Sequence, residues 1–276
     1  MRLIKIFSLL IAVSFVIVSC NNLAKIQKSK DPEYKLQKAN EFFEKKKYKN
    51  AQALYEELFT TYKGSQKFEE LYYKYAYTFY YLGMYHEAEG LFKGYLEVFP
   101  TSSKAEEIDY MRAYSFYKQS PPVELEQVNT KKAMLMMQTF INTHPGSERN
   151  KDAAKIIDEA RAKLELKDYK TAKLYYNLSQ YRAAALAFAD LLDSYPESMK
   201  GEEYKLMVVK SYYQFARLSI ESKKLERYEK VVEEYQDFLD RFPESSLRKE
   251  VESYSKLSLN HIKELKNEQA TSSAGF

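Results

Sequence analysis

Phe99-Pro100-Thr101-Ser102 is one of five related segments spaced along a chain of 276 residues. Proline lacks the N–H group that would continue a helix, and a serine just after it is a frequent cap of the next helix. The segment therefore predicts one helix end followed closely by one helix start. Its counterparts are His144-Pro145-Gly146-Ser147, Tyr195-Pro196-Glu197-Ser198, Phe242-Pro243-Glu244-Ser245 and the proline-less Tyr62-Lys63-Gly64-Ser65.

A fixed pattern of side-chain sizes precedes each segment. Twelve positions before the proline position stand small residues: Ala51, Ala88, Ala133, Ala184 and, slightly larger, Val231. Four positions further on stand Tyr55, Phe92, Met137, Phe188 and Tyr235, and seven positions on stand Leu58, Tyr95, Phe140, Leu191 and Phe238. Offsets of four and seven lie on one face of a helix, so five helices with the same buried face are expected.

This pattern resembles the second helix of the tetratricopeptide repeat, a helix-turn-helix unit of about 34 residues. The first helix of each unit is located by a small residue further upstream. We assign Ala39, Ala76, Ala113, Ala172 and Ser211 to these positions. The small residue permits close approach of two antiparallel helices, and the aromatic residue fills the space beside it.

The spacing also predicts irregular units. Units three and five have extra residues between their two helices: Ser120-Pro121-Pro122 is typical of a loop, whereas the charged stretch 222–229 is expected to extend helices. The stretch 148–168 contains no Gly or Pro and predicts a long first helix in unit four.

The resulting fold class is all-α, a right-handed α-solenoid of five irregular tetratricopeptide helix pairs with a C-terminal closing helix. The chain has seven Gly, seven Pro and no extended strand-like alternation. We expect a signal peptide at 1–19, a lipid-anchored tether at 20–31, a repeat domain at 32–265 that ends in a closing helix over 247–265, and a disordered tail at 266–276.

The N-terminus has the pattern of an export signal. Arg2 and Lys5 precede an apolar run over 6–18, which is too short for a stable membrane anchor. The run ends in Ile17-Val18-Ser19-Cys20, which resembles the lipobox of bacterial lipoproteins, with mild departures at Ile17 and Ser19. Cys20 is the one cysteine in the chain, so no disulfide competes for it. We predict acylation of Cys20, including a palmitate-type chain, and a membrane contact through that lipid anchor.

Asn21 after the cysteine predicts sorting away from the inner membrane, by resemblance to bacterial sorting rules. The segment after Cys20 also lacks the acidic run that some bacteria use for surface export. The expected location is therefore the cell outer membrane, on its periplasmic face.

The sequence contains little that would support an enzyme. His86, His144 and His261 are far apart and lack ligand-spaced neighbours, and no phosphate loop, nucleophile elbow or paired-cysteine motif occurs. We therefore expect no catalytic residues, no metal and no cofactor. Lys and Arg total 43 against 39 Asp and Glu, a balance that argues against nucleic acid as a partner.

Tyrosine is the residue that suggests a binding surface. Three positions of the first helix in a tetratricopeptide unit generally face the concave groove, and in units two to four they are almost all tyrosine. Tyrosine offers a large rigid contact area with a polar tip, which suits an extended peptide rich in aromatic side chains. Purely structural packing between helices is the alternative. The predicted groove residues are Tyr73, Tyr77, Tyr80, Tyr110, Tyr114, Tyr117, Tyr169 and Tyr176.

The chain as a whole resembles the BamD family, the tetratricopeptide lipoproteins of the outer-membrane β-barrel assembly (BAM) machinery. Five repeats behind a lipidated cysteine are common to both, and the resemblance covers roughly 31–265. The local matches are Ile108-Asp109-Tyr110-Met111-Arg112-Ala113, then Tyr169-Lys170-Thr171-Ala172-Lys173-Leu174-Tyr175-Tyr176 and Tyr195-Pro196-Glu197-Ser198.

This resemblance implies a non-enzymatic scaffold for outer membrane protein assembly. Its N-terminal repeats would bind the C-terminal signals of unfolded barrel proteins, which typically end in an aromatic residue. Its C-terminal repeats would bind the periplasmic domains of an Omp85-type insertase, alongside other assembly lipoproteins. A periplasmic tetratricopeptide adaptor for other cell-envelope complexes is the alternative. A glycan-binding lipoprotein is disfavoured because the chain has no tryptophan.

Overall fold

The computed structural model describes residues 23–274. The predicted signal peptide and Cys20 lie outside the described residues. A short helix over 23–27 precedes the first repeat, and its Ile26 is buried against that repeat.

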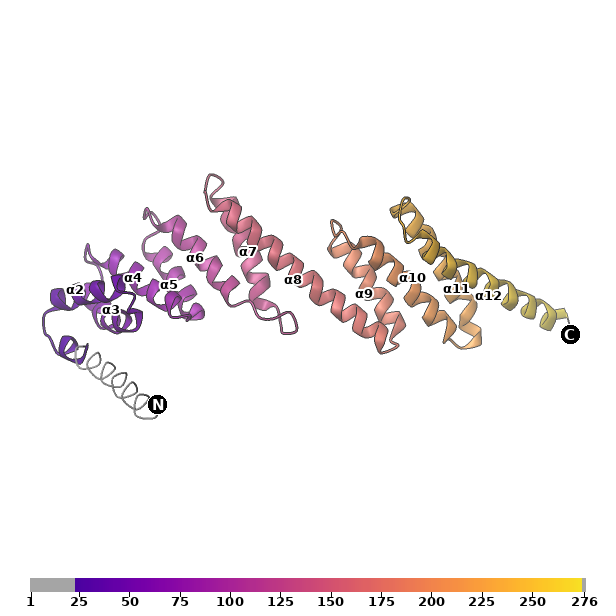
Figure 1. Ribbon diagram of the computed structural model, residues 1–276, viewed down its shortest axis with the longest axis horizontal. Helices are drawn as coiled ribbons and strands as arrows, with labels where there is room; N and C mark the ends of the chain where they lie inside the picture. The colour runs from indigo at the N-terminus through magenta and orange to yellow at the C-terminus, as the bar shows by residue number, and fades with distance from the viewer. Residues whose placement is uncertain (1–22, 275–276) are drawn as a thin grey trace, which may run out of the picture. The chain divides into compact units, whose positions relative to one another are not determined.

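Helices follow one another in antiparallel pairs, and the described residues contain no strand (Figure 1). The all-α solenoid of five helix pairs and a closing helix is therefore confirmed. The pairs are α2 (Pro32–Glu44) with α3 (Tyr48–Tyr62), α4 (Phe68–Tyr81) with α5 (Tyr85–Val98), α6 (Ala105–Lys118) with α7 (Val128–Thr143), α8 (Asn150–Asn177) with α9 (Tyr181–Ser194), and α10 (Gly201–Arg217) with α11 (Glu221–Arg241), followed by α12 (Arg248–Ala274).

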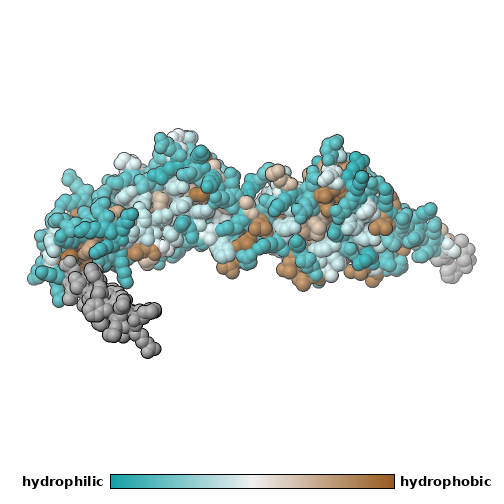
Figure 2. All heavy atoms as spheres, in the orientation of Figure 1, coloured by the Kyte–Doolittle hydropathy of each residue, from teal (hydrophilic) through white to brown (hydrophobic). Residues whose placement is uncertain are grey.

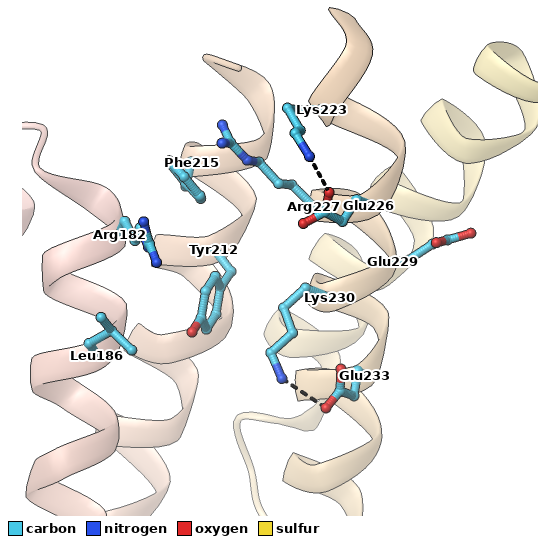
Figure 3. Close-up of a pocket in the computed structure, with 10 residues that line it drawn as sticks. All are labelled: Arg182, Leu186, Tyr212, Phe215, Lys223, Glu226, Arg227, Glu229, Lys230 and Glu233. Atoms are coloured by element: carbon cyan, nitrogen blue, oxygen red, sulfur yellow. Dashed lines mark hydrogen bonds and ion pairs between the residues drawn. The ribbon is translucent and has the colours of Figure 1, made fainter. Parts of the chain in front are cut away.

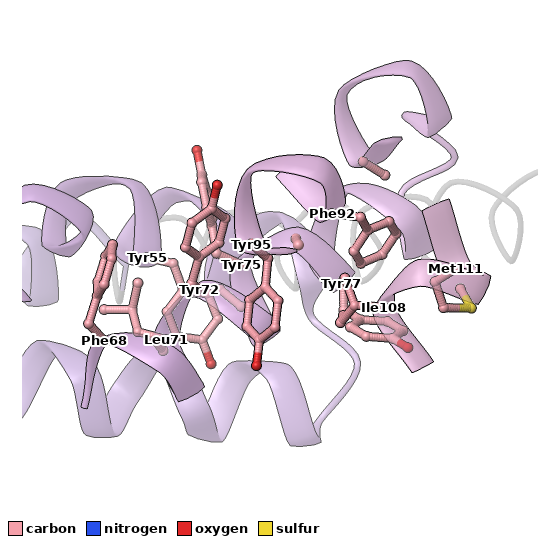
Figure 4. Close-up of a cluster of buried hydrophobic side chains, with 14 of the residues drawn as sticks. Tyr55, Phe68, Leu71, Tyr72, Tyr75, Tyr77, Phe92, Tyr95, Ile108 and Met111 are labelled. Carbon is pink, nitrogen blue, oxygen red and sulfur yellow. The ribbon is translucent and has the colours of Figure 1, made fainter. Parts of the chain in front are cut away.

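The buried face of each second helix is the one that the side-chain sizes predict. The small residues at its first position, from Ala51 to Val231, are inaccessible to solvent. The large residues at the next two positions are buried too, except Tyr235, which is partly exposed. Figure 4 shows this packing around Tyr55, Phe92 and Tyr95 in the first repeats. Close helix approach at the small residues and aromatic filling beside them account for the pairing.

The irregular units also follow the sequence. Helix α8 has 28 residues where α9 has 14, so the first helix of unit four is lengthened as expected. The charged stretch in unit five lies inside α11, which has 21 residues. In unit three the additional residues form the loop at 119–127, which contains the two prolines.

The serine of each proline segment joins the two ends of its unit. Its hydroxyl oxygen accepts a hydrogen bond from the backbone N–H two residues on, and its O–H donates to a glutamate near the start of the unit's first helix. The pairs are Ser102 with Glu69, Ser147 with Glu106, Ser198 with Glu165 and Ser245 with Glu202. Glu165 lies well inside α8, so the part of α8 before it is an extension of the repeat.

Unit one closes without proline. Gly64 has a φ of 82°, a left-handed conformation that a residue without a Cβ adopts freely. Here the glutamate at the start of the first helix, Glu33, accepts hydrogen bonds from the Tyr62 hydroxyl at 2.8 Å and from Lys67. Unit one thus keeps a glutamate at this position, but Tyr62 and Lys67 bind it in place of the serine that does so in the other units.

The chain divides into two compact units, one up to Ala160 and one from Arg161. The first has a single large buried cluster that reaches from Ile26 to Ile156. The second has two: one around Phe188 and Tyr204, and one around Phe238 and Val251.

Helix α12 differs from the expectation in its length. It continues to Ala274, through most of the segment expected as a disordered tail. No Gly or Pro interrupts this stretch, and Lys266 forms an ion pair of 3.2 Å with Glu229 of α11. Favourable helix propensity therefore extends α12 beyond residue 265, where the closing helix was expected to end.

Candidate peptide-binding surface

Six of the predicted groove tyrosines form a continuous row in the first compact unit. Ring centroids are 4.7 Å apart for Tyr73 and Tyr77, and 6.3 Å apart for Tyr77 and Tyr80. Tyr80 continues the row across to Tyr114 of α6 at 6.3 Å. Tyr114 in turn contacts Tyr110 at 5.8 Å and Tyr117 at 5.5 Å. The sequence placed these tyrosines at equivalent positions of two repeats, and the structure shows that their rings are neighbours in space.

Tyr169 and Tyr176 lie in the second compact unit, in a cluster of their own. Tyr169 contacts Phe188 and Tyr204, and Tyr176 contacts Tyr181 at 5.2 Å. Both rings are partly buried.

In units two, three and four, the first of the predicted groove tyrosines has a cation over its ring. Lys104 Nζ lies 5.2 Å from the ring centre of Tyr73, and Lys200 Nζ lies 5.7 Å from that of Tyr169. Arg149 takes the same role over Tyr110 at 5.3 Å. Each cation directly precedes the next unit or lies at its start, so this cation–π contact is a joint between successive units.

Hydroxyl groups of the row are also bound to neighbouring helices. Tyr73 donates to Glu107 Oε1 at 2.9 Å, and Tyr77 donates to the same oxygen. Tyr117 donates to Glu159 at 2.6 Å, and in the second unit Tyr169 donates to Glu203 at 3.0 Å. These glutamates belong to the first helix of the following unit, so the tyrosines join neighbouring repeats.

Four phenols of the row, those of Tyr77, Tyr80, Tyr110 and Tyr117, have a raised pKa. Burial and the hydrogen bond to Glu107 raise the pKa of Tyr77 far above its ordinary value. Burial raises the pKa of both Tyr80 and Tyr110 to about 12, and the hydrogen bond to Glu159 together with burial does the same for Tyr117. These four residues therefore present aromatic surface and neutral hydroxyls at physiological pH.

Burial divides the row into two kinds of residue. Tyr77 is 6% exposed and Tyr110 is 8% exposed, so these two rings are packing residues. The other six predicted tyrosines keep an exposed part. A peptide laid along this face could meet Tyr80 and Tyr114 directly, whereas Tyr77 and Tyr110 support them from beneath.

An open pocket of about 700 Å³ lies between α2 and α4 and was not expected from the sequence. Leu36 and Leu71 are its apolar part, and Asn40 is a polar group between them. The repeat frame contained the signal: Leu36 and Asn40 stand in unit one where Tyr73 and Tyr77 stand in unit two. Leu36 and Asn40 were not predicted as binding residues, because the prediction was based on tyrosine and unit one has none at these positions.

The walls of this pocket are mainly acidic. Glu33, Glu41, Glu44 and Glu70 line it, together with Lys45 and Lys67. Hydrogen bonds from Lys67 and Tyr62 lower the pKa of Glu33, so this carboxylate stays ionised at neutral pH. An apolar side chain on a cationic or neutral backbone segment would suit such a site.

A second pocket, of about 600 Å³, lies between α9, α10 and α11 in the second compact unit (Figure 3). Its apolar part consists of Leu186, Tyr212 and Phe215. The Arg227 guanidinium lies 4.0 Å from the ring centre of Phe215 and donates to the Ser219 hydroxyl.

The cations of this second pocket are not all neutralised. Lys230 is held by Glu233 at 2.8 Å and Lys223 by Glu226 at 3.0 Å. Among the described residues Arg182 has no carboxylate within ion-pair distance. The pocket therefore combines an aromatic floor with an available guanidinium, which suits an acidic or polar partner segment.

Two further properties bear on function. Between residues 23 and 274 no helix combines the length and apolar character needed to span a bilayer. The same part of the chain contains no group of three or more His, Cys, Asp or Glu side chains placed to hold a metal ion.

Comparison with known proteins identifies a family. A search of curated proteins found no match. Among solved structures, the TPR2AB domain of yeast Sti1 in its complex with a pHSP90 peptide is similar at 15% identity and a TM-score of 0.38, over 82% of this chain and 98% of that one. The model of the YfiO family, described as an outer membrane lipoprotein, matches residues 28–224. The chain therefore belongs to the YfiO family of outer membrane lipoproteins.

Proposed function

We propose that this protein is a non-enzymatic lipoprotein scaffold of the outer-membrane β-barrel assembly machinery. It is anchored by acylated Cys20 on the periplasmic face of the outer membrane. Its first compact unit binds the C-terminal signals of unfolded barrel proteins, and its second binds the periplasmic domains of an Omp85-type insertase. Membership of an outer membrane lipoprotein family supports this role.

The observation that carries the signal-binding part is the tyrosine row beside the α2–α4 pocket. Both occupy first helices of successive repeats. The pocket offers Leu36 and Leu71 to an apolar side chain, and the row offers exposed edges of Tyr80 and Tyr114. Alternating anchor points of this kind suit an extended segment with aromatic side chains.

Site-specific photo-crosslinking tests this assignment. A photoreactive residue at Leu36, Tyr80 or Tyr114 is expected to capture barrel C-terminal peptides that end in an aromatic residue. Tyr34 of α2 is a suitable control position because it is exposed and does not line the pocket. Equal capture at Tyr34, or none at the three test positions, would remove the support for signal binding here.

The insertase part rests on the pocket of the second unit. Its aromatic floor and unpaired Arg182 match the aromatic and arginine anchors that dominate protein interfaces. Arg182→Glu is expected to lower insertase co-purification in mild detergent by about tenfold or more. Substitution of Lys249, which is exposed on α12 away from the pocket, should have no effect.

The same co-purification separates the two candidate roles. Recovery of an Omp85-type insertase supports the barrel machinery. Its consistent absence, with other envelope proteins recovered instead, would assign the chain to the class of periplasmic adaptors.

A further inference from the structure

The second compact unit has two chemically different edges. Because successive helices are antiparallel, the turns within a pair lie on one edge and the turns between pairs lie on the other (Figure 1). We call the first the A–B edge and define it by residues 173–182 and 217–220. The opposite edge contains 195–203 and 242–250.

Large apolar side chains are exposed along the A–B edge. Leu178 is 60% exposed, Leu218 is 64% exposed and Ile220 is 70% exposed, and Leu174 of the preceding helical turn is exposed as well. Figure 2 shows hydrophobic residues along the lower margin of this unit, while its upper margin is mainly hydrophilic. On the opposite edge Met199 is the exposed large apolar side chain among the described residues.

Charge is distributed in the same way. The A–B edge itself, 173–182 and 217–220, contains Lys173, Arg182 and Arg217 and no Asp or Glu. The opposite edge, 195–203 and 242–250, contains Glu197, Glu202, Glu203, Glu244 and Glu250 against Lys200, Arg248 and Lys249. The A–B edge of this unit is thus basic and apolar, whereas the opposite edge carries an excess of two acidic residues.

Two of the edge cations lack an acidic partner, although Lys173 Nζ also lies 5.7 Å from the ring centre of Tyr169. Neither Lys173 near the end of α8 nor Arg217 at the end of α10 has a carboxylate within ion-pair distance in the part of the chain that the structure describes. A cation near a helix C-terminus is stabilised by the partial negative charge of the helix end, which accounts for the lysine and arginine here. It does not account for the exposed leucines around them. Helix α9, which begins on this edge, has no acidic residue in its first turn and no side-chain cap, so its first N–H groups also favour an anion.

The shape of the edge indicates the kind of partner. Leu178, Leu218 and Ile220 stand on protruding turns and line neither of the two pockets described above. Protein-binding anchors are generally buried in concave sites, whereas apolar side chains on turns, flanked by lysine and arginine, enter the boundary between lipid headgroups and acyl chains.

We propose that the A–B edge of the second compact unit rests on an anionic membrane surface. Its leucine and isoleucine side chains enter the headgroup region, and Lys173 and Arg217 contact lipid phosphates. This contact goes beyond the proposed scaffold function and is independent of the acyl anchor. Membership of an outer membrane lipoprotein family places the chain near a bilayer, where a weak second contact orients the repeats.

Vesicle flotation tests the proposal with the mature-length chain from residue 20 carrying Cys20→Ser, so that neither signal peptide nor acyl chain contributes. The probes are vesicles of phosphatidylcholine alone and of an equimolar mixture with phosphatidylglycerol. We expect binding to the anionic vesicles that weakens with added salt. Leu178→Ser with Ile220→Ser, and separately Lys173→Gln with Arg217→Gln, should each lower it by about fivefold or more.

Two matched controls lie on the opposite edge. Met199→Ser removes an exposed apolar side chain there, and Lys249→Gln removes an exposed charge. Both should bind as the parent does, and thermal unfolding should show that all variants are folded. Absence of vesicle binding, equal binding to neutral vesicles, or edge variants that bind as the parent does would overturn the proposal. Loss of insertase co-purification in edge variants that still bind vesicles would assign the edge to a protein and overturn it too.

Discussion

Ser102 donates a hydrogen bond of 2.6 Å from its hydroxyl to Glu69 Oε1, which lies 33 residues earlier at the start of α4. The same hydroxyl oxygen accepts from the Lys104 N–H at 3.0 Å. Tyr95 also donates to Glu69, at 2.9 Å. One small side chain therefore caps a turn and joins the beginning of a repeat to its end.

Ser102→Ala should destabilise the protein by about 1–2 kcal/mol, because the cap and the bond to Glu69 are lost together. Urea unfolding measures the difference. Ser103→Ala is the matched control, since Ser103 is exposed and makes no hydrogen bond through its side chain within residues 23–274. Equal effects of the two substitutions would contradict a specific role for Ser102.

The effect of Ser102→Ala should depend on pH. Hydrogen bonds from Ser102 and Tyr95 lower the pKa of Glu69 from its ordinary value of 4.5. A carboxyl group whose pKa is lower in the folded state stabilises the fold at neutral pH, and this contribution is lost as the pH falls below the ordinary value. The difference in unfolding free energy between parent and variant should therefore shrink in acid, as urea titrations near neutral pH and near pH ~3 would show.

Two glycines of α5 should respond oppositely to alanine. A Cβ at Gly94 would collide with the Tyr72 hydroxyl, whereas a Cβ at Gly90 would meet open space. Gly90→Ala should stabilise by about 0.5–1 kcal/mol through helix propensity, and Gly94→Ala should destabilise by about 1–3 kcal/mol through overpacking. Tyr72→Phe in the Gly94→Ala background should restore most of the loss, and failure to do so would show that the clash lies elsewhere.

Lys205 is a buried cation on α10, only 3% exposed, and it forms ion pairs with Glu234 and Asp237 of α11. Lys205→Ala should cost about 1–3 kcal/mol, because Glu234 and Asp237 lose their buried partner and keep only Lys230 and Arg241. Lys205→Met should cost less, since the longer side chain keeps the apolar packing.

Acid should weaken the same contact. Burial alone would raise the pKa of Asp237, but hydrogen bonds from Lys205 and Arg241 lower it below its ordinary value of 3.8. The stabilisation is therefore present at neutral pH and is lost as the pH falls through and below that value. Unfolding midpoints that are identical for parent and Lys205→Met at all pH values would refute this account.

Ser211 occupies the small-residue position of α10, and its buried hydroxyl oxygen has no hydrogen-bond partner within the described residues. Ser211→Ala preserves the small volume and removes an unsatisfied polar group. We expect a gain of about 1 kcal/mol in unfolding free energy, measurable as a raised thermal midpoint. A loss of stability would imply that the hydroxyl has a partner after all.

Periodic positions were the most predictable part of this protein. The offsets from Ala51, Ala88, Ala133 and Ala184 correctly placed the buried faces, because helix geometry alone sets which residues share a face. The length of α8 was predictable for a similar local reason. The end of α12 was not, since a marginal helix is extended or frayed by small differences in propensity and by a single ion pair such as Lys266 with Glu229.

The surface was less predictable than the core. The repeat frame aligned the eight tyrosines, yet Tyr77 and Tyr110 are buried while Tyr80 and Tyr114 retain exposed edges. That difference depends on how far the next repeat covers each ring, which involves residues more than thirty positions away, such as Glu107 for Tyr77. The α2–α4 pocket has the same origin, because it is the space left where two first helices do not fill the gap between them.

By itself the sequence determined the helix pairs, their buried faces and their irregular lengths, because these depend on spacing and local chemistry. The export signal and the acylation of Cys20 stay predictions. Tertiary structure alone decided that Ser102 binds Glu69, that Lys205 is sealed between two carboxylates, and which edge is apolar and basic. The physical reason is that exposure and pairing are properties of neighbours brought together from distant segments. In units two to five a proline ends the second helix, and in the folded chain the serine that follows joins this end to a glutamate of the first helix.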